Sequence, residues 1–199
     1  MKLATGPALL LSALAGCLAL SWARQGYSAP PVPGLSAARM RRALERFFPG
    51  YPEHFELDWK ALSRRDGELP DDETEDILEL LIDSAATDDE EHLLLAHLVA
   101  AGCRGSAHLW EDMGLASRSE LSALLAHYFP ALAARNTGDM KWKKFFYKQL
   151  CEREAITICR APSCRVCPDH PKCFGPEEAR GGGLFAVPVV DLARGTLTP

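Results

Sequence analysis

Two common catalytic signatures are missing from this sequence. It contains neither the glycine-rich loop that cradles phosphates nor the nucleophile elbow of the α/β-hydrolases. Few segments alternate apolar and polar residues as half-buried strands do, and no internal repeat occurs at the periods of solenoid proteins. These absences argue against a nucleotide-dependent enzyme, a hydrolase, a β-rich fold and a repeat protein. We therefore expect an all-α fold and no enzymatic turnover.

A long apolar run of membrane-spanning length is also missing. The apolar run at residues 8–23 is shorter than the roughly 20 apolar residues that a spanning helix needs. Leu14-Ala15-Gly16-Cys17 would serve as a lipoprotein cleavage box if the chain were exported. Export would place the clustered cysteines in an oxidising compartment, where disulfides are expected. We therefore expect this run to be the apolar first helix of a cytoplasmic protein, with export as the alternative.

Basic residues are absent from one long stretch, which divides the chain by charge. The 199 residues, 47% hydrophobic and 25% charged, have the composition of one ordinary globular domain. Residues 66–91 hold 13 acidic residues and no Lys or Arg; the other 14 acids face all 22 Lys and Arg, so the remainder carries a net charge of +8. Acidic side chains are favoured near helix N-termini, so the stretch is typical of two well-capped helices. A docking or metal-capturing surface is the alternative.

Capping residues and helical periodicity predict where the helices lie. Apolar residues recur at three- and four-residue spacing behind Ser or Thr residues that can act as N-caps. The first predicted helix is capped by Ser36 and stopped by Phe48-Pro49-Gly50, the second follows Glu73, and the third is capped by Thr87. The fourth runs from the capping box Ser117-Arg118-Ser119-Glu120 to Tyr128 and is closed by Phe129-Pro130. The fifth covers residues 140–153.

This pattern predicts a single helical domain with additions at both ends. Residues 1–35 form the apolar helix and a Pro-rich linker, and residues 36–178 form the helical domain with a cysteine-rich loop at residues 151–175. Residues 179–199 lack a helical period and contain Gly and Pro, which predicts a disordered, flexible tail.

Cysteine is concentrated near one end of the chain. Five of the seven cysteines lie within residues 151–173, and four follow the spacing Cys159-x4-Cys164-x2-Cys167-x5-Cys173. Such short spacings let several thiolates converge on one centre from a loop. An iron–sulfur cluster tolerates this uneven spacing, whereas a structural zinc site more often uses two separated cysteine pairs. Zinc and disulfides remain the alternatives.

The cysteine-rich segment is also irregular and basic. Pro162, Pro168 and Pro171 interrupt it, which predicts a loop rather than a regular helix. Residues 135–173 contain nine Lys and Arg against four acids, a net charge of +5. This charge could offset anionic thiolates and attract molybdate or an acidic partner, or it could belong to a solvated helix face. The aromatic residues at 142–147 imitate a nucleic-acid patch but have the spacing of a core stripe.

On these residues the sequence resembles the NifQ family of nitrogen-fixation proteins. The resemblance rests on residues 108–115 (HLWEDMGL), on Asn136 with residues 140–145 (MKWKKF), on residues 150–153 (LCER) and on the cysteine spacing that ends in residues 173–177 (CFGPE). It is strong over residues 96–178 and looser over residues 34–50. The apolar run near the N-terminus looks least like the family.

The resemblance implies a molybdenum carrier. Its iron–sulfur cluster would be held by Cys159, Cys164, Cys167 and Cys173. The cluster would take up molybdenum from molybdate or a molybdenum–sulfur species, giving a Mo–Fe–S cluster. As a metallochaperone, the protein would pass the metal to the scaffold complex NifEN with the iron protein NifH, during biosynthesis of the iron–molybdenum cofactor FeMo-co. Neither nucleic acid nor a membrane is expected as a partner.

Three further residues are candidate metal ligands. Thiolate and imidazole groups suit such metals, so Cys103, His108 and Cys151 could each reach the cluster or a transient molybdenum species. The alternatives are a small buried thiol for Cys103, a buried hydrogen-bonding side chain for His108 and helix packing for Cys151. The rival function is a zinc- or cluster-stabilised regulatory or nucleic-acid-binding domain that uses the basic helix at residues 141–148.

Overall fold

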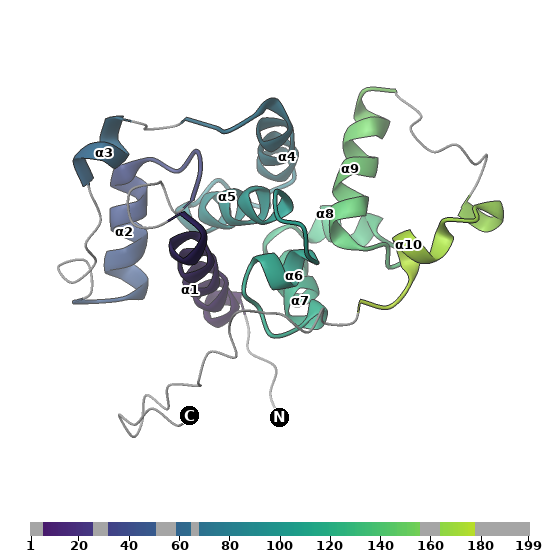
Figure 1. Cartoon of the computed structure of the whole chain (residues 1–199), viewed down its shortest axis with the longest axis horizontal. Coiled ribbons are helices and arrows are strands. Elements are labelled where there is room, and N and C mark those ends of the chain that lie inside the picture. Colours follow the sequence, from purple (N-terminus) through teal and green to yellow (C-terminus); the bar gives the residue numbers. More distant parts are fainter. Residues whose placement is uncertain (1–5, 26–31, 51–58, 65–67, 156–163, 178–199) are drawn as a thin grey trace, which may run out of the picture.

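The computed structural model describes residues 6–25, 32–50, 59–64, 68–155 and 164–177, and within these ranges all regular structure is helical (Figure 1). The prediction of an all-α fold is confirmed. Cys159 and the predicted tail at residues 179–199 lie outside the described residues. The helices are α1 (Gly6–Gln25), α2 (Ala37–Phe47), α3 (Trp59–Arg64), α4 (Asp72–Asp83), α5 (Glu90–Cys103), α6 (Leu109–Asp112), α7 (Arg118–Tyr128), α8 (Pro130–Arg135), α9 (Trp142–Arg153), the 3-10 turn η1 (Cys164–Val166) and α10 (His170–Phe174).

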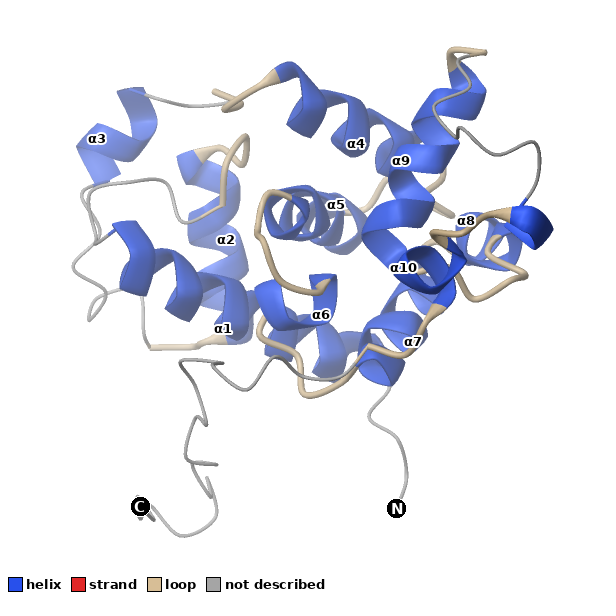
Figure 2. Ribbon diagram, turned by 45° about the vertical axis from the view of Figure 1, so that its right-hand side comes forward, coloured by secondary structure: helices blue, strands red, loops and turns tan. Residues whose placement is uncertain are grey.

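Helix α5 lies at the centre of the helices α1–α9, which we call the helical body (Figures 1 and 2). Nine of its residues are buried, and they lie on all sides of the helix. A helix that is apolar all round is stable only when other elements cover it. Helices α1, α4 and α6 provide this cover, so the core of the body forms around α5.

The apolar run at residues 8–23 lies within helix α1, which packs against α5, α6 and α7. Leu9, Leu10 and Leu14 are at most 2% exposed. The backbone of α1 lies very close to the turn after α6. A Cβ atom added to Gly114 would lie only 2.5 Å from the Cα atom of Gly16, so there is no room for a side chain at this position. Gly114 also has a φ of +67°, a conformation that favours glycine. Among the described helices, none is long and apolar enough to cross a membrane.

The predicted N-caps Ser36 and Ser117 are confirmed. Their hydroxyl groups accept hydrogen bonds from the backbone N–H groups of Arg39 and Glu120, both at 3.3 Å. The prediction that Thr87 caps the next helix is wrong. Asp89 is the N-cap of α5, since its carboxylate accepts the N–H groups of two residues in the first turn, each at 3.0 Å. Thr87 instead donates its hydroxyl proton to Asp89.

Three other helix boundaries differ from the predictions. Helix α4 begins at Asp72, directly after its N-cap Asp71, and therefore starts before Glu73 rather than after it. Phe129 ends α7 as predicted, but Pro130 opens the short helix α8, because proline is tolerated in a first turn. Helix α9 begins after residue 141, because the Asn136 side chain bonds both the N–H and the carbonyl of Met140 at 2.8 Å and holds a turn there.

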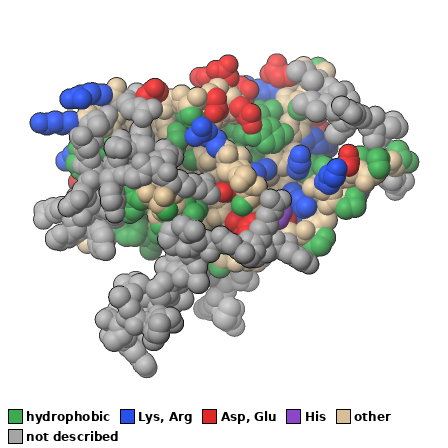
Figure 3. Space-filling view, viewed as in Figure 1, with side chains coloured by type: hydrophobic (Ala, Val, Ile, Leu, Met, Phe, Trp, Pro, Cys, Tyr) green, Lys and Arg blue, Asp and Glu red, His purple; other side chains and the backbone are tan. Residues whose placement is uncertain are grey.

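Acidic side chains gather over α4 on the face seen in Figure 3. Acids stand in the first turns of both α4 and α5, as the helix-dipole interpretation predicts. Their N-caps carry charge as well. Hydrogen bonds from Thr74 lower the pKa of the Asp71 carboxyl, and those from His92 lower the pKa of the Asp89 carboxyl.

Candidate metal centre

Residues 164–177, which we call the cysteine segment, carry three of the four predicted ligands. The segment lies beside α8 and the start of α9, at the opposite end of the molecule from α2 and α3 (Figures 1 and 2). The sequence predicts a loop here, but the segment contains two short helical turns, η1 and α10. Proline is accommodated because Pro171 occupies the first turn of α10.

The three cysteines lie on consecutive turns of the segment. Cys164 is exposed, while Cys167 and Cys173 are half-buried. The N–H of Cys167 donates to the carbonyl of Cys164 at 3.3 Å, and the N–H of His170 donates to the carbonyl of Cys167 at 3.1 Å. Two successive turns thus run from Cys164 to His170, where α10, the helix that carries Cys173, begins.

No group of three or more Cys, His, Asp or Glu side chains among the described residues is arranged to hold a metal ion. The three thiols of the segment therefore do not converge on one point with a further donor in this conformation. Cys159, the fourth predicted ligand, lies outside the described residues. The donor types required for a thiolate site are present, and none of the three described thiols is tied up in a disulfide.

The segment meets the helical body at the turn before α9. The backbone N–H of Lys141 donates to the carbonyl of Cys173 at 2.8 Å, and its ammonium donates to the carbonyl of Pro171 at 3.5 Å. The ring of Phe174 lies against Gly138, where an added Cβ atom would be only 3.1 Å away. Phe174 also stacks on His170, with ring centroids 4.4 Å apart. These contacts fix the position of Cys173.

A second junction joins the end of the segment to α6 and α7. The Glu177 side chain is only 4% exposed, and its Oε1 lies 3.8 Å from Arg118 Nη1 and 3.8 Å from His108 Nδ1. The other terminal nitrogen of Arg118 donates to the Asp139 carboxylate and to the carbonyls of Asp139 and Met140, at 2.9–3.0 Å. Arg118 therefore binds both the turn before α9 and the end of the cysteine segment.

Part of the predicted basic surface is removed by burial. Lys143 donates to the Asp112 carboxylate and to the Gly105 carbonyl, both at 2.7 Å, and its side chain is 16% exposed. Lys144 and Lys172 remain exposed, and Lys141 is half-buried. The Asp169 carboxylate, 2.6 Å from the ammonium, raises the pKa of Lys172, and the neighbouring thiols add to this rise. Among the described side chains, Lys172 of α10 supplies positive charge next to the thiols.

Cys103 lies in the core rather than beside the other thiols. It is 5% exposed at the end of α5, and burial raises the pKa of its thiol to about 12. A thiol with such a pKa remains protonated at neutral pH and is a poor metal ligand until it loses its proton. The structure supports the alternative interpretation of Cys103 as a small buried side chain.

The other two additional candidates have different surroundings. His108 is the N-cap residue of α6, and its backbone N–H donates to Glu111 at 3.0 Å. Its ring faces Glu177, so the structure brings it to the end of the cysteine segment. Cys151 is half-buried in the last turn of α9. Neither belongs to a metal-holding group among the described residues.

Two residues that the sequence did not single out, Arg118 and Glu177, organise this end of the molecule. Glu177 stands in the motif that carries the family resemblance, yet nothing in the sequence predicts that it meets a helix some sixty positions earlier in the chain.

Comparison with known proteins decides the family. A family model described as NifQ matches residues 13–175. The chain belongs to the NifQ family. Among curated relatives, Protein NifQ of Azotobacter vinelandii is 54% identical over 110 residues, which are 55% of this chain and 56% of that protein. Protein NifQ homolog of Sinorhizobium fredii is 41% identical over 163 residues, 81% of this chain and 67% of that protein. Protein NifQ of Rhodobacter capsulatus is 40% identical over 144 residues, 72% of this chain and 76% of that protein.

The NifQ match includes most of the described structure. It begins inside α1 and ends at Gly175, so it spans the core around α5 and all three described thiols. The aligned part of the chain spans little more than half the length of the Azotobacter relative. No solved structure matches the chain. Membership of the NifQ family places the protein in nitrogen fixation.

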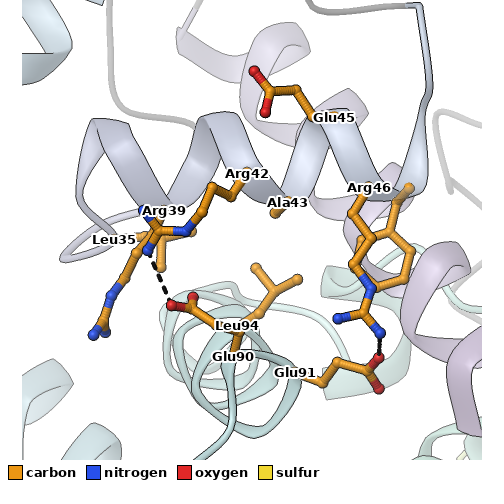
Figure 4. Close-up of a pocket in the computed structure, with 10 residues that line it drawn as sticks. Leu35, Arg39, Arg42, Ala43, Glu45, Arg46, Glu90, Glu91 and Leu94 are labelled. Atoms are coloured by element: carbon orange, nitrogen blue, oxygen red, sulfur yellow. Dashed lines mark hydrogen bonds and ion pairs between the residues drawn. The ribbon is translucent and has the colours of Figure 1, made fainter.

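A groove of about 440 Å³ lies between α2 and α5 (Figure 4), and α2 is at the opposite end of the molecule from the cysteine segment (Figure 1). Arg42 pairs with Glu90 at 3.0 Å, and Arg46 pairs with Glu91, so charged residues of the two helices neutralise each other across it. Leu94 lines its floor, and Glu45 points away from α5. The groove in this NifQ-family chain is a charged seam between two helices.

Proposed function

We propose that this NifQ-family protein carries molybdenum on an iron–sulfur cluster held by Cys159, Cys164, Cys167 and Cys173, and donates it for assembly of the iron–molybdenum cofactor. The acceptor would be NifEN acting with NifH, and the protein would work in the cytoplasm without turnover of its own. The observation that carries the proposal is that Cys164, Cys167 and Cys173 lie, exposed or half-buried, on one short segment whose helix α10 buries no residue. Family membership supports the same role.

The donor set suits an iron–sulfur cluster. Thiolates are the usual ligands of such clusters, and soft sulfur ligands also suit molybdenum–sulfur species. Because the described thiols do not yet converge, the turns at residues 164–170 must adjust when the ligands close on the metal. Among the described residues, the backbone hydrogen bonds of these turns are local, so the turns can adjust without disturbing the helical body.

The positive side chains near the thiols favour an anionic cargo. Lys172 lies close enough to Cys167 and Cys173 for their charges to interact, and Lys141 holds the carbonyl of Cys173. Positive side chains raise the local concentration of an anion such as molybdate. When bound, the cluster would supply a sulfur-rich site for molybdenum, while the chain's own residues supply ligands and compensating charge.

Three of the aromatic residues that the rival nucleic-acid-binding function would use are buried. Trp142, Phe145 and Phe146 are at most 5% exposed and pack against one another in the core. Bases stack only on accessible aromatic faces, so these rings are not available to single strands.

Metal analysis of single-cysteine variants tests the proposal. We expect wild-type protein purified without oxygen to contain iron, sulfide and molybdenum, and to bleach in air because accessible clusters oxidise. Alanine at position 159, 164, 167 or 173 should abolish iron retention, whereas the control Cys17→Ala, in the buried face of α1, should retain it. Colourless wild-type protein containing one zinc ion, or iron loss in Cys17→Ala equal to that in Cys164→Ala, would contradict the proposal.

A further inference from the structure

The cysteine segment is docked to the helical body mainly at its C-terminal end. The described contacts that fix it lie between residues 171 and 177: the hydrogen bond from Lys141 to the Cys173 carbonyl, the packing of Phe174 on Gly138 and the ion pairs of Glu177. At the other end Cys164 is exposed, and η1 contacts α10. The segment thus resembles an arm attached at one end.

Glu177 makes the most buried of these contacts. Its side chain is 4% exposed, while those of its partners Arg118 and His108 are 17% and 16% exposed. A carboxylate removed from water in this way is stabilised only by nearby positive charge or donors. Arg118 supplies that charge, and it cannot swing away easily, because Asp139 and the Met140 carbonyl hold its other terminal nitrogen.

We infer that Glu177 is a positioning residue for the metal centre. Its carboxylate, held between Arg118 and His108, docks the end of the segment so that Cys173 stays against the start of α9 while Cys164 and Cys167 remain accessible. His108 therefore acts here as a partner of the docking carboxylate, through its contact with Oε1. The value of this docking for a metal rests on the proposed function, but the docking itself is a property of the metal-free chain.

Thiol alkylation of the full-length, metal-free, reduced protein tests the docking. We would measure iodoacetamide labelling rates cysteine by cysteine with mass spectrometry, in wild type, Glu177→Gln and Glu177→Lys. A matched control is Glu90→Gln, which removes an exposed carboxylate that pairs with Arg42 in the groove between α2 and α5. Thermal unfolding followed by circular dichroism reports on the helical body in each variant.

Loss of docking should expose Cys173 selectively. In Glu177→Gln the labelling rate of Cys173 should rise at least about threefold, and more in Glu177→Lys, because local opening becomes more frequent. Cys164 is already exposed and should not change, the core residues Cys17 and Cys103 should stay protected, and Glu90→Gln should match wild type. An unchanged Cys173 rate in both variants would overturn the inference, as would equal acceleration at Cys103, since that would mean general loosening.

A second measurement links the docking to the metal. In protein loaded with iron and sulfide, Glu177→Gln should lose iron to a chelator faster than wild type and Glu90→Gln, with an altered visible circular dichroism spectrum of the cluster. If wild-type protein binds no cluster, the proposed function fails while the labelling result still decides the docking. If clusters form and their release and spectrum are identical in Glu177→Gln, the positioning role is wrong.

Discussion

Different interactions stabilise the helical body and the cysteine segment. In the body, α5 alone buries nine residues, and α1 adds a row of leucines to the same core. In the segment, α10 buries no residue, and the thiols are exposed or half-buried. Burial of apolar surface stabilises the body, whereas a few polar contacts and one aromatic ring hold the segment in place. The proposed chemistry is therefore located where a change of conformation costs the fold least.

The largest expected effect separates the two regions by stability. Leu14→Ala removes a fully buried side chain and should lower the free energy of unfolding by about 3 kcal/mol. Cys164→Ala changes an exposed side chain and should lower it by less than about 0.5 kcal/mol. Urea denaturation of metal-free protein measures both values. Similar values for the two variants would show that the segment is part of the cooperative core.

The Leu14 result also bears on export. Lipoprotein processing at Cys17 would remove Leu9, Leu10 and Leu14 from the core, because all three precede the cleavage point. A large loss of stability in Leu14→Ala would therefore mean that processing at this box is incompatible with the fold described above.

A somewhat smaller effect is expected at the buried ion pair that joins α6 to α9 within the helical body. Asp112, with a side chain 1% exposed, pairs with Lys143 of α9 and also accepts the N–H of Ala107 at 3.0 Å. Asp112→Asn leaves the ammonium without its counter-charge and should cost about 3 kcal/mol or slightly less. Glu152→Gln on the same helix breaks an exposed pair with Lys148 and should cost less than about 0.5 kcal/mol. Equal losses in urea denaturation would mean that burial of the pair has no consequence.

The smallest expected effect is a pH dependence of stability that arises from His97 in the helical body. Burial lowers the pKa of His97 from its usual value of 6.5, and Arg39 adds to this; the ring contacts the Leu93 carbonyl at 2.8 Å. The unfolded chain then binds a proton more readily than the folded one, so the stability of the fold should fall as the pH drops below 6.5.

Replacement of His97 tests this source of the pH dependence. His97→Gln should make the free energy of unfolding less dependent on pH over that range, and the exposed His127→Gln should leave the slope as in wild type. An unchanged slope in His97→Gln would assign the effect to other groups.

The local features of the fold could be predicted from the sequence. Ser36 and Ser117 were identifiable as N-caps because a cap needs only a hydroxyl and the N–H groups two or three residues ahead. The sequence pattern favours Thr87 as the next cap, but Asp89, two residues later, offers a carboxylate that reaches two N–H groups at once. Pro130 was ambiguous because proline both follows helices and starts them.

The chemistry of the candidate site is a prediction from the sequence, whereas its placement in the fold comes from the structure. The cysteine spacing predicts a thiolate site without any knowledge of the fold, since ligand type and spacing are properties of the chain itself. The pairing of Asp112 with Lys143 and of Glu177 with Arg118 depends on how distant helices pack, and a single sequence contains no signal for it. For the same reason the sequence could not show that Cys103 is in the core and that His108 faces the end of the segment.

The most direct test of the account is the coordination of molybdenum in the protein itself. Protein isolated without oxygen from cells that make molybdenum nitrogenase would be examined by X-ray absorption at the molybdenum and iron edges. We expect sulfur neighbours around molybdenum with iron beyond them, and loss of this signal in Cys164→Ala but not in Cys17→Ala. Molybdenum surrounded only by oxygen in the wild type, or a signal that survives Cys164→Ala, would contradict it.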